Sequence, residues 1–296
     1  VTQGVNCYDD TTGEITFTVT PIQVGVPPYE YSIDNGSNYQ TSNVFSNLNG
    51  DVNYLVMIED DNGCSFIDSI YLSEPAEIIY SATLSDYNGF GISCNGDANG
   101  IVTASASGGT GTLTYSLDGL NFQSSPVFSG LEAGPHTIIY SDINGCTADT
   151  TITLTEPGVF NIFPISSDYN GTDISCFGYS DGEIYSTDSN GVSAVLYEFN
   201  NSGILTATAS WDSLSSGAYN IYAEDSNGCN TSQTVTLVDP PVLAANLTVV
   251  SNEYCNNMNG ELEIIASGGT GALNYTWSDG QNTSIATGLV AGNYQC

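Results

Sequence analysis

The sequence predicts an all-β fold, arranged as a tandem array of immunoglobulin-like β-sandwich repeats. Three observations predict this class. Short motifs recur at a period of about 82 residues, apolar and polar residues alternate over many short segments, and Gly, Asn and Pro separate these segments. No window of useful length has the periodicity of an amphipathic helix. One small folding unit is therefore expected to repeat along the 296 residues.

Three markers define the period. The first is a cysteine followed by a glycine five or six residues later, and its copies begin at Cys7, Cys94, Cys176 and Cys255. The second is Asn-Gly-Cys, and its copies end at Cys64, Cys146 and Cys229. The third is an acidic residue before proline, found at Glu74, Glu156 and Asp239. Because the markers keep one register, we predict four repeats, over residues 1–75, 76–157, 158–240 and 241–296. The first is expected to be truncated at its N-terminal end and the fourth at its C-terminal end.

The second repeat shows the expected elements most clearly. About seven short strands are predicted for one repeat, and six of them fall at 78–83, 101–107, 113–117, 127–128, 136–140 and 150–154. Asp118-Gly119 and Asn144-Gly145 are typical of tight hairpin turns. Short strands with regular turn signals are the pattern of a small immunoglobulin-like sandwich.

A Leu-x-x-Gly-x-Tyr motif recurs just before one of the last predicted strands of a repeat. It places Tyr219 and Tyr294 at equivalent positions, with Tyr54 in a looser copy and His136 at the same position in repeat 2. In immunoglobulin-like sandwiches a tyrosine at such a corner bonds its hydroxyl to the backbone just upstream. We therefore interpret His136, the only histidine, as a structural residue and not as a catalytic or metal-binding one.

The composition excludes several classes of function. The chain has no Lys or Arg and 33 Asp plus Glu, which gives a formal net charge of −33. Such a charge repels phosphate backbones and anionic lipids, so nucleic-acid binding and docking on a membrane surface are excluded. No run of 18 apolar residues is present, which argues against membrane insertion. Eight cysteines, most of them in register, indicate an oxidising, extracellular setting.

The ordered motifs resemble those of the SprB repeat family across all of 1–296. They are Cys-Asn-Gly, Ser-Gly-Gly-Thr-Gly before a tyrosine (Ser107 to Tyr115 and Ser267 to Tyr275), Leu-x-x-Gly-x-Tyr and Asp-x-Asn-Gly-Cys. Residues 21–25 and 188–191 depart from the second motif. The resemblance implies a giant Bacteroidetes cell-surface adhesin of the gliding-motility type, exported by type IX secretion and displayed on the outer surface. It also implies partners in the secretion and gliding machinery, an external surface or polysaccharide, and neighbouring repeats of the same chain.

Two disulfide pairings are open. One joins the markers within each repeat, as Cys7–Cys64, Cys94–Cys146 and Cys176–Cys229, and the rival joins neighbours as Cys64–Cys94, Cys146–Cys176 and Cys229–Cys255. Sequence does not fix connectivity. We favour the first pairing, because each repeat would then be self-contained and a closed loop of that size would contribute roughly 4 kcal/mol. Cys296 breaks the register, and a Cys255–Cys296 bond is a further alternative. Zinc is not expected, since neither Cys-x-x-Cys nor a histidine partner is present.

Acidic loops raise the question of calcium. Hard oxygen ligands of the kind Ca²⁺ prefers occur at Asp9, Asp10, Glu14, Asp97, Asp181 and Glu183. No loop has the spacing of an EF-hand, and Asn, Asp and Gly also close turns without metal. We favour structural turns, keep calcium as the alternative, and expect no other cofactor.

A catalytic function is not expected. The sequence has no Ser/His/Asp ordering, no Cys–His pair, no phosphate-binding loop and no lysine. We therefore predict a non-catalytic stalk segment of a large secreted adhesin that mediates surface attachment and gliding. The alternatives are a subunit of an extracellular fibre or sheath, and accessory binding modules of a secreted enzyme. Glu-Pro junctions leave little spacer, so neighbouring repeats are expected to stack end to end, each about 30–40 Å long.

Overall fold

The computed structural model describes residues 2–20 and 25–296, and throughout them the chain forms strands and loops. No helix among them is long and apolar enough to cross a membrane. The chain divides into two compact units, Val1–Glu156 and Pro157–Cys296. The predicted all-β class is confirmed. The four repeat boundaries stay a prediction, and repeats 1 to 4 name those sequence segments below.

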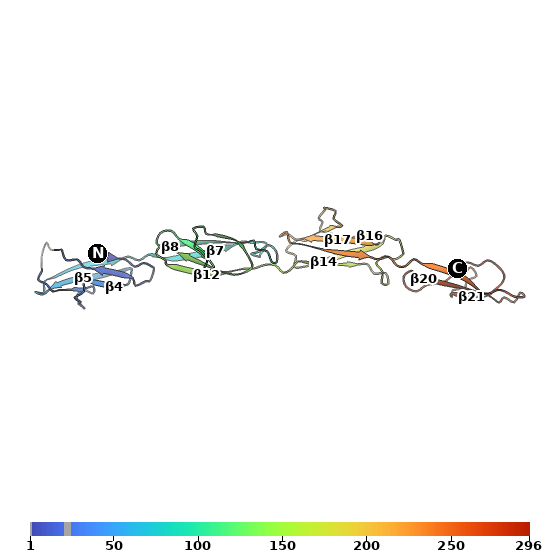
Figure 1. Cartoon of the computed structure of the whole chain (residues 1–296), viewed down its shortest axis with the longest axis horizontal. Coiled ribbons are helices and arrows are strands. Elements are labelled where there is room, and N and C mark those ends of the chain that lie inside the picture. The colour runs from blue at the N-terminus through green and yellow to red at the C-terminus, as the bar shows by residue number, and fades with distance from the viewer. Residues whose placement is uncertain (1, 21–24) are drawn as a thin grey trace. The chain divides into compact units, whose positions relative to one another are not determined.

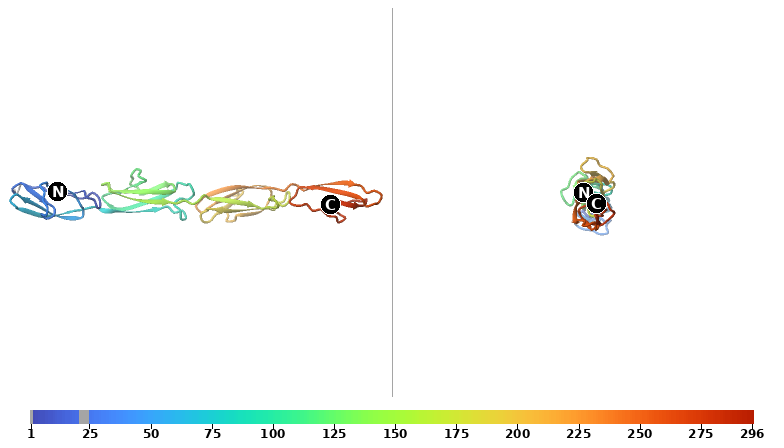
Figure 2. Two further views of the ribbon diagram at one scale, coloured as in Figure 1. Left: turned by 90° about the horizontal axis from the view of Figure 1, so that it is seen from below. Right: turned by 90° about the vertical axis from the view of Figure 1, so that its right-hand side faces the viewer.

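Repeat 2 contains two three-stranded antiparallel sheets that enclose one core (Figures 1 and 2). The first sheet has the order β10-β8-β7, and the second has the order β12-β11-β9. The strands are β7 (Ala76–Leu84), β8 (Gly100–Gly109), β9 (Thr114–Leu117), β10 (Val127–Leu131), β11 (Gly134–Ser141) and β12 (Thr147–Leu154). Each of the six predicted strands coincides with one of these, and repeat 2 has six strands where about seven were expected.

Repeats 1 and 3 are built on the same plan, whereas the described strands of repeat 4 form one three-stranded sheet with the order β19-β20-β21. Repeat 3 comprises β13 (Asn161–Ser166), β14 (Gly182–Ser189), β15 (Leu196–Phe199), β16 (Ser210–Leu214), β17 (Gly217–Glu224) and β18 (Asn230–Leu237). Repeat 1 comprises β1 (Thr2–Gln3), β2 (Gly13–Thr16), β3 (Tyr29–Ser32), β4 (Val44–Leu48), β5 (Val52–Asp60) and β6 (Ser65–Leu72). Repeat 4 comprises β19 (Ala244–Ser251), β20 (Gly260–Ser267) and β21 (Ile285–Leu289).

The core of repeat 2 follows from alternation along the strands. Val102 and Ala104 on β8 point inward from one sheet, and Ile138 and Tyr140 on β11 point inward from the other, all with 3% exposure or less. Alternate side chains of a strand lie on opposite faces, so one apolar set is buried between the sheets. Each fully buried aliphatic side chain of this size contributes roughly 1.5–3 kcal/mol. The sandwich is therefore held mainly by apolar burial.

The turns fit the sequence with one difference. Asp118 and Gly119 both have positive φ, 51° and 73°, as a two-residue hairpin turn requires. The expected tight turn at Asn144-Gly145 is wider than predicted, because Ser141 pairs with Thr147 and leaves residues 142–146 as a five-residue loop.

The predicted corner is confirmed. Tyr219 and Tyr294 each donate their hydroxyl to a backbone carbonyl four residues upstream, at 2.9 and 3.0 Å, and Tyr54 donates to the carbonyl of Asn49 at 3.2 Å. His136 makes the equivalent bond, with Nε2 donating to the Glu132 carbonyl at 3.0 Å. A histidine therefore replaces the tyrosine in the same structural task.

His136 also bonds on its other ring nitrogen. Nδ1 lies 3.0 Å from a carboxylate oxygen of Asp118. Because both partners are acceptors, both ring nitrogens can donate only when the ring is protonated. Burial lowers the pKa of His136, but the hydrogen bonds to Asp118 and to the Glu132 carbonyl outweigh it and hold the pKa above 6.5. The Thr137 amide and His136 lower the pKa of Asp118 against the effect of burial, so this carboxylate stays ionised near neutral pH.

We predict that His136 makes the stability of repeat 2 depend on pH. A raised folded-state pKa stabilises the fold fully below the unfolded pKa, and this stabilisation is lost as pH rises through the folded value. Urea unfolding between pH 5.5 and 7.5 should show this loss, and His136→Tyr should remove the dependence while keeping the corner bond. An unchanged pH dependence in His136→Tyr would show that the histidine is not its source.

Candidate functional site

The four first-marker loops share one closing hydrogen bond. In each, the amide before the cysteine donates to the side-chain oxygen of the residue before the glycine. The pairs are Asn6 to Thr12 at 2.9 Å, Ser93 to Asn99 at 3.2 Å, Ser175 to Asp181 at 3.2 Å and Tyr254 to Asn259 at 2.8 Å. The first marker is therefore a defined loop with its cysteine near the start.

The third marker lies beside the first-marker loop of the same repeat. In repeat 2 the Glu156 carboxylate accepts from the Gly96 amide at 2.7 Å and from the Asn95 side chain at 3.1 Å. In repeat 3 Asp239 accepts from the Gly178 amide at 3.3 Å. The acidic residue before proline therefore holds the first-marker loop beside the end of the last strand of the repeat.

The second-marker loop is organised by an aspartate. Asp142, 6% exposed, accepts from the amides of Asn144 and Cys146, both at 2.9 Å, and from the amide of Thr110 at 2.8 Å. A carboxylate is well suited to satisfy three converging amides. Asp60 and Asp225 make the same three bonds in repeats 1 and 3, with Val26 and Val192 in the place of Thr110.

The bonds to these aspartates can be compared with the two segments that depart from the Ser-Gly-Gly-Thr-Gly motif. Residues 188–191 differ from Ser-Gly-Gly-Thr-Gly, yet the following amide of Val192 keeps the bond to its aspartate at 2.9 Å. The other departure, at 21–25, falls mostly outside the described residues. The backbone amide, and not the side chains of the motif, therefore makes the contact.

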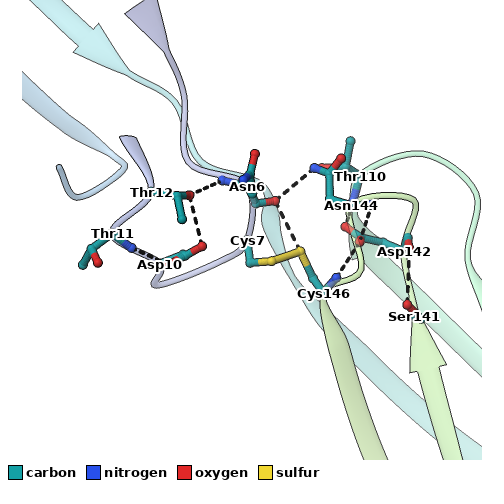
Figure 3. Close-up of a disulfide and its surroundings, with 10 residues drawn as sticks. All are labelled: Asn6, Cys7, Asp10, Thr11, Thr12, Thr110, Ser141, Asp142, Asn144 and Cys146. Carbon is teal, nitrogen blue, oxygen red and sulfur yellow. Dashed lines mark hydrogen bonds between the residues drawn. A yellow bond between two sulfur atoms is a disulfide. The ribbon is translucent and has the colours of Figure 1, made fainter. Parts of the chain in front are cut away.

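A disulfide joins repeats 1 and 2. Cys7, in the first-marker loop of repeat 1, bonds to Cys146, in the second-marker loop of repeat 2, with an S–S length of 2.03 Å and a Cα–Cα distance of 5.6 Å (Figure 3). The Asn144 side chain donates to the Asn6 carbonyl at 3.1 Å, and the Cys146 sulfur lies 3.3 Å from the same oxygen. A groove of about 620 Å³ beside the bond is lined by Tyr8, Glu77, Tyr80 and Asp149 among others.

This bond corrects the expected connectivity. Both the favoured Cys7–Cys64 and Cys94–Cys146 pairs and the rival Cys64–Cys94 and Cys146–Cys176 pairs are wrong. The reason is strand length: the eight-residue β6 runs from beside Cys64 to Ser73, whose carbonyl binds the Val5 amide next to the Cys7 loop. Eight residues of strand span roughly 25 Å, whereas a disulfide needs Cα atoms about 4.4–6.8 Å apart.

The other cysteines divide into two groups. Cys94 and Cys229 are each disulfide-bonded. Among the described residues the free thiols, all exposed, are Cys64, Cys176, Cys255 and Cys296. The favoured Cys176–Cys229 pair and the rival Cys229–Cys255 pair are therefore wrong, as is the alternative Cys255–Cys296 bond.

Unit 2 repeats one feature of the junction. Thr270, in the Ser-Gly-Gly-Thr-Gly segment of repeat 4, donates its hydroxyl to the Ser175 carbonyl at 3.3 Å. Ser175 precedes Cys176 as Asn6 precedes Cys7. In both units the carbonyl before the first-marker cysteine therefore accepts a hydrogen bond from the next repeat.

The candidate calcium ligands are used in turns. Asp10 accepts from Thr11 and Thr12, Asp97 from the Ser93 hydroxyl at 2.9 Å, and Asp181 from the Ser175 hydroxyl. The Ser175 hydroxyl lowers the pKa of Asp181 against the effect of burial. Glu14 accepts from Thr16 at 3.1 Å. In the described part of the chain no three His, Cys, Asp or Glu side chains are grouped to hold a metal. Calcium binding stays a prediction.

Comparison with known proteins gives a family match and several structural similarities. The SprB repeat family model matches residues 1–38, 92–122 and 247–282. No curated protein matches the chain. The three N-terminal domains of the Hoc outer capsid protein of bacteriophage RB49 are 13% identical, with a TM-score of 0.39 over 70% of this chain and 78% of that one.

Two further solved structures are similar. The protocadherin GammaB4 extracellular domain is 12% identical, with a TM-score of 0.32 over 98% of this chain and 60% of that one. The SGBP-B protein of the Bacteroides ovatus mixed-linkage glucan utilization locus, in complex with a mixed-linkage heptasaccharide, is 13% identical. Its TM-score is 0.17 over 83% of this chain and 68% of that one.

We predict that Asp142 stabilises the second-marker loop. Asp142→Ala removes the acceptor of three backbone amides in a buried setting, so unit 1 should lose about 3 kcal/mol of its free energy of unfolding. Asp149→Ala, an exposed aspartate seven residues away on β12, should change it by less than about 0.5 kcal/mol. Urea unfolding of both variants checks this, and equal losses would contradict the assignment.

Proposed function

We propose, from the match of the SprB repeat family model to three segments of the chain, that it is a non-catalytic stalk segment of a large cell-surface adhesin. SprB repeats belong to cell-surface proteins, and the matches cover three separate segments of the chain. The finer proposal is an adhesin of the gliding-motility type, exported by type IX secretion and acting on an external surface or polysaccharide. We propose no catalytic activity for this segment.

The main observation behind the proposal is the disulfide bond between repeats 1 and 2. Cys7 and Cys146 lie 139 residues apart in sequence, and the bond between them spans the junction of repeats 1 and 2. Tension applied along the chain can pass through the S–S bond and not only through the backbone between the two cysteines. Such a disulfide would help a stalk to resist extension even when the sandwiches within the disulfide loop unfold.

The charge supports the same role. With 33 acidic residues and no Lys or Arg, the surface of one chain repels that of another. Side chains of one sign also discourage pairing between exposed sheet edges of neighbouring chains. A stalk crowded among others on a cell surface would remain separate from them.

Force spectroscopy on the intact chain tests the stalk proposal. In the oxidised protein, the Cys7–Cys146 bond should limit the contour length that is released when unit 1 unfolds. Cys7→Ser should release additional contour length, because the backbone between Cys7 and Cys94, the next disulfide-bonded cysteine, then comes under tension.

The matched control is Cys296→Ser, which removes an exposed free thiol and should behave as the unmodified chain. The same released length in the oxidised chain and in Cys7→Ser would mean that the tie does not carry tension, and the mechanical part of the proposal would fail.

A further inference from the structure

The groove beside the disulfide of unit 1 is built from both of its repeats. Tyr8 comes from the first-marker loop of repeat 1. Glu77 and Tyr80 come from β7, and Asp149 comes from β12 of repeat 2. The volume of about 620 Å³ falls within the range of roughly 300–1,000 Å³ that is usual for small-ligand sites. Because Tyr8 follows Cys7 directly, the disulfide fixes the backbone of this tyrosine beside repeat 2.

Two tyrosine rings are accessible in this groove. Tyr8 is 51% exposed and Tyr80 is 41% exposed. The Tyr80 ring stacks on the buried Tyr140, with ring centroids 5.0 Å apart and an angle of 23° between the planes. Tyr140 is itself held by the hydrogen bond from its hydroxyl to the Ser81 carbonyl, at 3.1 Å. Tyr80 is therefore a fixed apolar surface, and a ligand that packs on it has little side-chain ordering to offset.

Two carboxylates in the same groove are open to a ligand. Glu77 and Asp149 are exposed, and neither side chain forms a hydrogen bond or an ion pair within the part of the chain that the structure describes. An ionised carboxylate accepts hydrogen bonds and donates none. Since the chain has no Lys or Arg, donors to these two groups must come from water or from a ligand. The groove therefore offers acceptors beside aromatic rings, and its charge repels anions.

The fold of the repeat does not require these four side chains. Counted from the same cysteine and proline markers, the equivalent positions one repeat later hold Asn95, Val159, Ile162 and Ser232. None of these four is aromatic or acidic. A ligand of unit 1 accounts for side chains that the packing of a sandwich does not demand.

We propose that this groove binds a neutral polysaccharide. A pyranose ring has a face of C–H groups that packs on an aromatic ring, and hydroxyl groups around its edge that donate hydrogen bonds. Tyr8 and Tyr80 would contact the faces of sugar rings, and Glu77 and Asp149 would accept from their hydroxyls. The two carboxylates and the net charge of −33 would repel a polymer of uronic acids or sulfated sugars. The proposed function names an external polysaccharide as a partner, and the inference rests on it.

Affinity gel electrophoresis of the full chain tests this site. The native gels contain galactomannan, xyloglucan or laminarin as neutral probes, or alginate as an anionic probe. We expect at least one neutral probe to retard the chain, whereas alginate should not. Tyr8→Ala should raise the dissociation constant for that probe about tenfold, because one aromatic contact is lost. Glu77→Ala should raise it about fivefold, because one hydrogen-bond acceptor is lost. Tyr8→Phe keeps the ring and should bind as the unmodified chain does.

The matched control is Tyr179→Ala. Tyr179 is 57% exposed and lies in the first-marker loop of repeat 3, so its removal takes away a similar ring outside the groove. This variant should bind the neutral probe with an unchanged dissociation constant. The urea midpoints of all four variants should equal that of the unmodified chain, which separates a lost contact from a lost fold.

Several outcomes would overturn the site. They are the absence of retardation by every neutral probe, binding of alginate as tight as that of the neutral probes, and equal weakening by Tyr8→Ala and Tyr179→Ala. Poly-L-lysine serves as the comparator for a basic protein partner. Retardation by poly-L-lysine that Tyr8→Ala alone abolishes, without polysaccharide binding, would assign the groove to a basic peptide instead.

Failure of the site can be told apart from failure of the proposed function. Binding of a neutral probe that Tyr8→Ala leaves unchanged would keep the polysaccharide as a partner and remove only this groove as its site. The stalk role depends on the Cys7–Cys146 bond, which force spectroscopy tests separately.

Discussion

Strand length is the constraint on which the rest of the structure depends. Repeats 1 to 3 are each one sandwich long, and the two marker loops of each lie at opposite ends of the strands that connect them. β6 separates Cys64 from the end of repeat 1 at which the Cys7 loop lies. A cysteine at one end cannot reach its counterpart at the other end of the same repeat. It can reach the loop of the adjoining repeat, and the Cys7–Cys146 bond forms there.

The recurring motifs form the contacts at the junction of repeats 1 and 2. The first-marker loop presents a cysteine and a carbonyl, and the acidic residue of the third marker fixes that loop in place, as Glu156 does in repeat 2. On the other side, Asp142 folds the second-marker loop so that Asn144 and Cys146 meet the incoming carbonyl. The motifs keep one register because they build the two halves of one contact.

Much of the fold could be predicted from sequence because it depends on local pattern. Alternation placed the six strands of repeat 2, and the Leu-x-x-Gly-x-Tyr step predicted a corner that Tyr219 and His136 both complete. The partner of Cys7 could not be predicted in this way, since pairing depends on which loops share an end of the sandwich. The expected repeat length of about 30–40 Å carried an unused signal, because loops at the two ends of such a repeat lie too far apart for a disulfide.

Disulfide mapping of the unreduced chain tests the central claim most directly. With no Lys or Arg, the chain is cut with a protease that cleaves at acidic residues, free thiols are alkylated beforehand, and linked peptides are identified by mass. The junction described above predicts a peptide pair that joins Cys7 to Cys146, with Cys64 alkylated. A pair that joins Cys7 to Cys64 would contradict it, because each repeat would then be closed on itself.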